Sequence, residues 1–164
     1  MRKLSILNTR EIKKIKEILF SQFSYNLSRN YAYLMNERNR LFIVNKDISH
    51  LNIDNLILDR YGLYFGELSG TELRLSKEGA QFVARTAKET KQKLSNIIPL
   101  IKEEIKSYFK GNDLPKELSN ENRFVLLSYN HDIFGCAKYK NGTIINSLPK
   151  IYRGEVIIWE QSKK

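Results

Sequence analysis

The residue types that serve as nucleophiles, proton carriers and soft metal ligands are scarce in this sequence. His50 and His131 are its only histidines and Cys136 is its only cysteine. Neither histidine lies in a His-Glu-x-x-His or Cys-x-x-Cys setting, so the common zinc motifs are absent. We expect His131 to lie exposed in a turn, and Cys136, within an apolar run, to be a core residue rather than a nucleophile. The sequence therefore predicts no catalytic residue, no metal site and no enzyme activity.

The glycines give no sign of nucleotide chemistry either. They form neither the Gly-x-Gly-x-x-Gly dinucleotide pattern nor a phosphate loop that ends in Gly-Lys-Ser/Thr. No cofactor is therefore expected. A single cysteine excludes an intramolecular disulfide and favours a reducing, cytoplasmic setting, and no apolar stretch approaches the roughly 20 residues of a membrane span.

Positive charge is the strongest functional feature of the sequence. Lys and Arg number 28 against 18 Asp and Glu, giving a net charge of +10 and a pI of about 9.6. Residues 133–154 hold four basic residues and no acidic one: Lys138, Lys140, Lys150 and Arg153. Such a balance favours a polyanionic partner, above all nucleic acid, although lysine-rich composition can also serve solubility alone.

Two tyrosines stand next to these cations. Tyr139 lies between Lys138 and Lys140, and Tyr152 precedes Arg153. A tyrosine can stack on an unpaired base while a neighbouring cation holds the phosphate backbone, but it can equally pack in a core or at a sheet edge. The predicted RNA-binding residues are Lys138, Lys140, Lys150, Tyr152 and Arg153.

These residues must be positioned by an α+β fold. Asn8 and Glu11 form a capping-box pattern before an amphipathic helix, Ser76 caps a second helix, and a third helical segment, helical already over Ile98–Ile105, ends at Gly111. Apolar and β-branched runs predict the following strands: Tyr31–Met35, Leu41–Val44, Leu56–Leu58, Leu63–Leu68, Glu72–Leu75, Phe124–Tyr129, Ile133–Tyr139, Thr143–Asn146 and Glu155–Trp159.

Local signals also fix turns and a division of the chain. Asn141-Gly142 favours the positive backbone angles of a two-residue hairpin turn. The polar segment 88–93 has few apolar anchors. We therefore expect an N-terminal mixed α/β domain with an antiparallel sheet over residues 1–92 and a second domain over 93–164.

Three segments resemble known RNA-associated proteins. Tyr64–Leu68 followed by Leu73-Arg74-Leu75, and Ser107–Leu114 with its Phe-Lys-Gly-Asn, are similar to signature regions of the Nip-seven family of ribosome-biogenesis proteins. Gly135-Cys136-Ala137, followed by Asn146–Lys150 and Arg153, resembles the small β-barrel called PUA. The three segments occur in the family's order, and the chain looks like an archaeal-type member.

The resemblance implies an N-terminal α/β domain followed by a PUA-like RNA-binding barrel without catalytic activity. It further implies binding to rRNA or uridine-rich single-stranded RNA during large-subunit assembly and rRNA processing. The implied partners are pre-ribosomal particles, other assembly factors and the exosome, in the cytoplasm or, in a eukaryote, the nucleolus. Lys150 and Arg153 are the positions that match the family's RNA-contacting basic residues.

Two other functions fit the same residues. The chain could be the RNA-targeting accessory subunit of a modification enzyme, a methyltransferase or a pseudouridine synthase, and would then need a separate catalytic partner. It could also be a module that presents its basic surface to acidic proteins, with no preference among nucleic acids.

Overall fold

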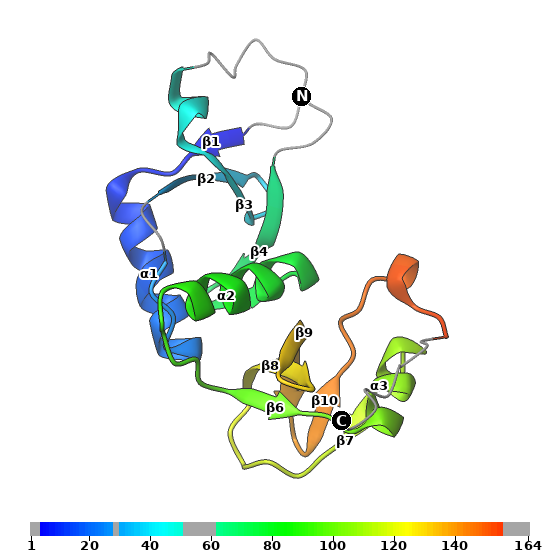
Figure 1. Ribbon diagram of the computed structural model, residues 1–164. Coiled ribbons are helices and arrows are strands. Elements are labelled where there is room, and N and C mark those ends of the chain that lie inside the picture. The colour runs from blue at the N-terminus through cyan, green and yellow to red at the C-terminus, as the bar shows by residue number, and fades with distance from the viewer. Residues whose placement is uncertain (1–3, 28–29, 51–61, 156–164) are drawn as a thin grey trace, which may run out of the picture. The chain divides into compact units, whose positions relative to one another are not determined.

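The computed structural model describes residues 4–27, 30–50 and 62–155, and Figure 1 shows the chain. The chain divides into two compact units, Met1–Asn96 and Ile97–Lys164. In the described residues each unit holds one five-stranded sheet with α-helix beside it, so the fold is α+β as predicted. The strands predicted at Leu56–Leu58 and Glu155–Trp159 lie wholly or almost wholly outside the described residues.

The first unit is built on an antiparallel sheet whose strands follow one another in chain order. Its strands are β1 (Leu4–Ile6), β2 (Tyr31–Asn36), β3 (Arg40–Asn45), β4 (Leu63–Ser69) and β5 (Glu72–Leu75), and a 3₁₀ turn, η1 (Lys46–His50), follows β3. The predicted strands that fall within described residues are confirmed to within about two residues. The short strand β1 was not predicted.

Both helices of the first unit begin at the predicted caps. The Asn8 side chain accepts hydrogen bonds from the N–H groups of Arg10 and Glu11 before α1 (Thr9–Phe23), and the Glu11 carboxylate accepts one from the Asn8 N–H. Ser76 accepts from the Gly79 N–H at the start of α2 (Lys77–Glu89). Both helices pack against β5, and α2 also packs against β4.

Over residues 97–155, the second unit is a curled sheet, half of a barrel, with one α-helix (Figure 1). Its elements are β6 (Ile97–Pro99), α3 (Lys102–Phe109), β7 (Leu114–Pro115), β8 (Arg123–Tyr129), β9 (Asp132–Lys140), β10 (Thr143–Ile145) and the 3₁₀ turn η3 (Lys150–Tyr152). The strand order is β6-β8-β9-β10-β7, and β6 runs parallel to β8 while the other pairs are antiparallel.

The beginning of the second unit differs from the sequence prediction. Ile97–Pro99 is a strand and not part of a helix, because it pairs with Leu126–Ser128 of β8. The helix begins only at Lys102, where the Glu104 carboxylate accepts a hydrogen bond from the Ile101 N–H at 2.9 Å. Lys116 donates to the same carboxylate at 2.8 Å and ties α3 to the chain after β7.

The predicted hairpin turn is confirmed. Asn141 and Gly142 have φ values of 48° and 76°, and Lys140 pairs with Thr143 across them. Asn130 and His131, with φ values of 47° and 70°, make a second two-residue turn between β8 and β9. His131 is therefore the exposed turn residue that the sequence predicts.

The core of the second unit includes Tyr139 and Cys136, whose roles the sequence left open. Tyr139 is fully buried, and its hydroxyl accepts the N–H groups of Leu118 and Ser119 and donates to the Ser119 carbonyl at 2.9 Å. Tyr139 is therefore a core residue and cannot stack on a base. Cys136 is also buried, with 4% of its surface exposed, in agreement with the core assignment.

Candidate functional site

The predicted site residues Lys150, Tyr152 and Arg153 lie in one loop that is attached to the end of α3. The turn η3 is closed by hydrogen bonds from the Tyr152 N–H to the Pro149 carbonyl at 2.9 Å and from the Arg153 N–H to the Lys150 carbonyl at 3.1 Å. The Gly154 N–H then donates to the Phe109 carbonyl at 2.9 Å. We call residues 146–154 the basic loop; its turn η3 is visible beside α3 in Figure 1.

The start of the basic loop is fixed by one asparagine. The Asn146 side chain donates to the carbonyls of Tyr108 and Asn112 at 2.6 and 3.0 Å, and its backbone N–H donates to Asp113 at 2.7 Å. The Ser147 hydroxyl donates to the Cys136 carbonyl at 2.9 Å. Together with the Gly154 bond, these bonds hold the loop at both ends, which reduces the conformational entropy that it would lose on binding a ligand.

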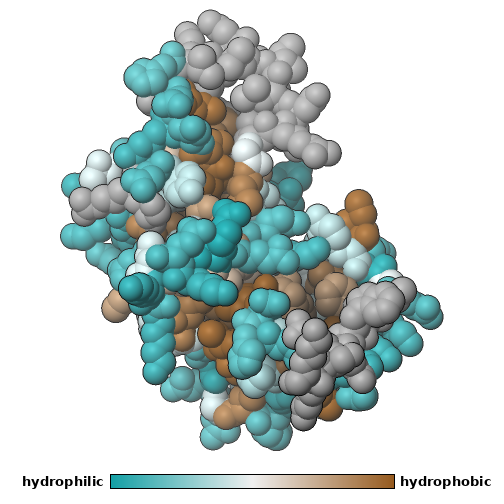
Figure 2. Space-filling view, in the orientation of Figure 1, coloured by the Kyte–Doolittle hydropathy of each residue, from teal (hydrophilic) through white to brown (hydrophobic). Residues whose placement is uncertain are grey.

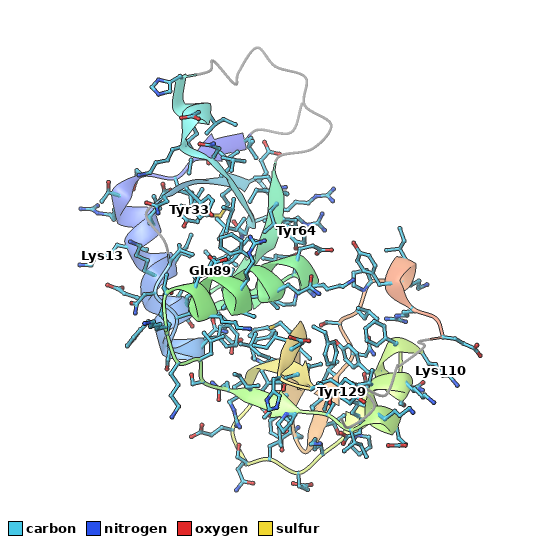
Figure 3. All side chains as sticks on the ribbon, in the orientation of Figure 1. Lys13, Tyr33, Tyr64, Glu89, Lys110 and Tyr129 are labelled. Carbon is cyan, nitrogen blue, oxygen red and sulfur yellow. The ribbon has the colours of Figure 1, made fainter. Side chains whose placement is uncertain are left out.

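A glycine allows Arg153 to lie against the end of α3. Gly111 has a φ of 97°, and a Cβ on it would come within 2.9 Å of the Arg153 side chain. Arg153 Nε also donates to the Leu148 carbonyl at 2.9 Å. The contact with Gly111 places Lys110, labelled in Figure 3, next to the basic loop.

The basic loop exposes apolar and charged groups together. Ile151 is 85% exposed and Tyr152 39% exposed, while Lys150 and Arg153 are also exposed. Figure 2 shows this as a small apolar patch at the place of η3, with hydrophilic surface around it. An aromatic ring between cations offers stacking and phosphate contacts within a single turn of chain.

Lys138 and Lys140 lie elsewhere in the second unit. They occupy the face of β9 opposite buried Tyr139, as strand alternation predicts, and Lys140 lies at the hairpin turn. The Lys138 ammonium stands 4.5 Å from the centre of the Phe124 ring. The structure therefore separates the four predicted cations into a strand pair and a loop pair.

One acidic group that is distant in sequence lies beside the turn after the strand pair. A Cβ on Gly142, in the turn after Lys140, would lie 2.7 Å from Oε1 of Glu117. A carboxylate from outside the acid-free stretch therefore lies beside the turn that follows Lys140. The basic loop also has an acidic neighbour, Asp113, whose carboxylate accepts a hydrogen bond from the Asn146 N–H.

Sequence reasoning missed the contribution of α3 to this surface. Lys106 and Lys110 are exposed and stand four residues apart, the spacing that places side chains on one helix face. This spacing could have been recognised in the sequence. The proximity of Lys110 to Arg153 could not, because it depends on the contact of Arg153 with Gly111 in the folded chain.

Buried neighbours of the loop do not supply reactive groups. Burial raises the pKa of Tyr108, although its bonds to Ser147 and the charge of Arg153 act in the opposite direction, so its hydroxyl stays neutral at physiological pH. In the described ranges, no three His, Cys, Asp or Glu side chains gather in a way that could hold a metal ion.

No helix in the described part of the chain is long and apolar enough to cross a membrane.

A comparison with known protein families identifies the kind of domain that the second unit forms. Residues 95–154 match the PUA domain of the methyltransferase RsmF. The matched range begins just before β6 and ends with the basic loop, so the second unit is a PUA-like domain. A PUA domain indicates RNA binding, in agreement with the net charge and with the cations of the loop. No curated protein matches the chain.

Proposed function

We propose that this protein is a non-catalytic RNA-binding factor that acts in assembly of the large ribosomal subunit and in rRNA processing. The observation that carries the proposal is the match of residues 95–154 to a PUA domain, whose basic loop exposes Lys150, Tyr152 and Arg153. The ribosomal role is supported by the resemblance of Tyr64–Leu68 and Ser107–Leu114 to the Nip-seven family. Its partners are then pre-ribosomal particles, other assembly factors and the exosome.

The basic loop accounts for how RNA would be held. Lys110, Lys150 and Arg153 contact phosphates, and Tyr152 stacks on a base that is not paired. Single-stranded RNA fits this arrangement better than a duplex, because a base must leave its stack before an aromatic side chain can cover it. Uridine-rich RNA or an unpaired rRNA segment is the proposed ligand.

The absence of catalysis is part of the same proposal. The thiol of Cys136 is buried, and His131 lies exposed in the turn between β8 and β9. In this setting the two residues cannot act together as a catalytic nucleophile and its general base. We expect the purified chain neither to cleave or modify RNA nor to hydrolyse nucleotides.

One observation favours a second candidate function. Because the matched PUA domain is that of a methyltransferase, the chain could be the RNA-targeting accessory subunit of an RNA-modification enzyme, a methyltransferase or a pseudouridine synthase. In that case catalysis would come from a separate subunit. The accessory subunit would then be bound to that catalytic chain in fixed stoichiometry.

Crosslinking in cells followed by sequencing of the bound RNA, together with co-purification, tests the two candidates. The assembly factor is expected to crosslink to rRNA precursors and to co-purify with pre-ribosomal particles or exosome components. A stoichiometric methyltransferase or pseudouridine synthase, with crosslinks confined to its modification sites, would replace the first candidate by the second. Crosslinking to no RNA would contradict both.

A further inference from the structure

A second group of cations lies in the first unit, on three neighbouring strands of its sheet. Arg40 of β3 is opposite Glu67 of β4, and Glu67 is opposite Arg74 of β5, so the three side chains form a row across the sheet. Arg40 and Phe42 alternate with the buried Leu41 and Ile43. The row therefore lies on the face opposite to the one that Leu41 and Ile43 bury.

The charges in this row do not balance. Both arginines approach the same oxygen of Glu67: Arg40 Nε lies 3.7 Å and Arg74 Nη2 3.2 Å from Oε2. Within the row, one carboxylate thus faces two guanidinium groups, which leaves one positive charge in excess among these three residues; Glu72 lies on the same face of β5, two residues before Arg74. Among the described residues the Arg40 Nε is buried without a hydrogen-bond partner, although the side chain as a whole is 43% exposed.

An aromatic residue lies beside Arg40, whose Nε has no hydrogen-bond partner in the described part of the chain. The guanidinium carbon of Arg40 lies 5.9 Å from the centre of the Tyr64 ring, and that ring packs against Phe42 at 5.5 Å between centroids. Tyr64 is labelled on β4 in Figure 3. A guanidinium that is stacked on a ring keeps its fork of donors oriented, so less freedom is lost when it binds a phosphate.

A purely structural role explains this row poorly. Side chains exposed to this extent, 43% for Arg40, 36% for Glu67 and 45% for Arg74, form ion pairs that contribute little to stability. One arginine would already neutralise Glu67. The second arginine adds like charge to the pair, which favours an anion that comes from outside the chain.

We infer that Arg40 and Arg74 bind a phosphate group of single-stranded RNA, and that Glu67 holds the two side chains in place until the phosphate displaces it. This inference rests on the proposed function, since RNA is the ligand that the PUA-like domain indicates. It adds an RNA contact in the first unit to that of the basic loop. RNA is favoured over an acidic protein because a guanidinium fork matches the paired oxygens of a phosphate and because the bases offer further stacking.

Variants of the full-length chain test the inference with a fluorescent uridine-rich oligoribonucleotide as the probe. Arg40→Gln combined with Arg74→Gln is expected to weaken binding by about tenfold, the effect of one charge-assisted hydrogen-bonded pair. It should also reduce the slope of log affinity against log salt by about 0.7 for each phosphate that the variant no longer binds. Arg10→Gln combined with Arg85→Gln is the matched control, because it removes two arginines from the same unit at positions outside the row.

Glu67→Gln separates binding from structure. It removes the carboxylate that competes with phosphate, so RNA affinity is expected to rise, whereas the loss of a structural ion pair would lower stability without improving binding. The inference is overturned if the Arg40 and Arg74 variant binds as tightly as its control, or if Glu67→Gln leaves RNA affinity unchanged. If the unaltered chain binds no RNA, the proposed function fails and this inference fails with it.

Discussion

At the scale of single residues, exposure separates the two tyrosines that stand beside cations in the sequence. Tyr139 is fully buried and Tyr152 is 39% exposed. Both positions look alike in sequence, and only the alternation of β9 and the path of the basic loop distinguish them. One is a core residue and the other a proposed stacking residue, and a different experiment applies to each.

Tyr152 is expected to contribute to RNA binding through its ring. Tyr152→Ala should weaken binding of a uridine-rich single strand by about 1–3 kcal/mol, the usual contribution of one base stacked on an aromatic ring. Tyr152→Phe keeps the ring and should bind almost as tightly as the unaltered chain. Fluorescence titration measures both, and equal losses in the two variants would show that the hydroxyl group, and not stacking, matters.

Tyr139 is expected to affect stability alone. In Tyr139→Phe the N–H groups of Leu118 and Ser119 lose their acceptor. Because both groups are only partly buried, we expect a loss of about 0.5–1.5 kcal/mol, the usual net contribution of a hydrogen bond. Denaturant unfolding should show this loss, while the folded variant keeps its RNA affinity. A variant of normal stability would mean that water replaces the phenol oxygen.

At the scale of elements, α3 depends on the pair formed by Glu104 and Lys116. Burial acts to raise the pKa of Glu104, but the hydrogen bonds from Lys116 and from the Ile101 N–H outweigh it and lower the pKa below its usual value. The folded state therefore binds the Glu104 proton less tightly than the unfolded state does. The resulting stability is present above the unfolded value and is lost as the pH falls through the folded value.

Glu104→Gln tests this linkage. At neutral pH the variant should be less stable by about 1–3 kcal/mol, because the Lys116 ammonium loses its charged acceptor. As the pH falls through the range in which Glu104 takes up its proton, the difference between variant and unaltered chain should shrink. Thermal unfolding as a function of pH measures it, and a difference that stayed constant down to the acid range would show that the carboxylate charge plays no part.

Caps and turns that depend on neighbouring residues could be predicted from the sequence. Short strands that form only by pairing with a strand distant in the chain could not. Asn8, Ser76 and Asn141-Gly142 each specify their cap or turn through neighbouring residues, and all three are confirmed. The strands β1, β6 and β7 hold only three, three and two residues, too few for an alternating pattern. They exist because an edge of a longer strand is available to each.

The candidate site shows the same limit. Nothing in the sequence divides its four cations, because Lys138 and Lys150 belong to one uninterrupted acid-free stretch. The division depends on hydrogen bonds of the basic loop to α3, such as that from Gly154 to Phe109, which join residues far apart in the chain. For the same reason Lys110 could not be assigned to the site from its sequence neighbours.

At the scale of the whole molecule, the net charge of +10 should make binding strongly dependent on salt. Each phosphate contacted in a single strand is expected to lower log affinity by about 0.7 per unit of log salt. A titration series from low to moderate salt gives the number of contacts directly. Affinity that does not change with salt would remove the electrostatic basis of the proposal.

RNA binding by the basic loop of the PUA-like domain can be tested with one pair of matched variants. The first replaces Lys110 and Lys150 together by Ala in the full-length chain, and binding of a uridine-rich oligoribonucleotide is measured. Lys13 and Lys14 on the exposed side of α1 provide a control with the same loss of charge; Lys13 is labelled in Figure 3. Surface substitutions of this kind change stability by only about 0.5 kcal/mol each, so both variants should fold.

We expect the Lys110 and Lys150 variant to lose most of its RNA affinity while the Lys13 and Lys14 variant keeps most of it. Replacement of Lys138 and Lys140 should have a smaller effect than replacement of Lys110 and Lys150, because Glu117 lies beside the turn that follows Lys140. Equal losses in the loop variant and the α1 control would mean that the chain binds RNA as a diffuse polycation and that the basic loop is not the binding site.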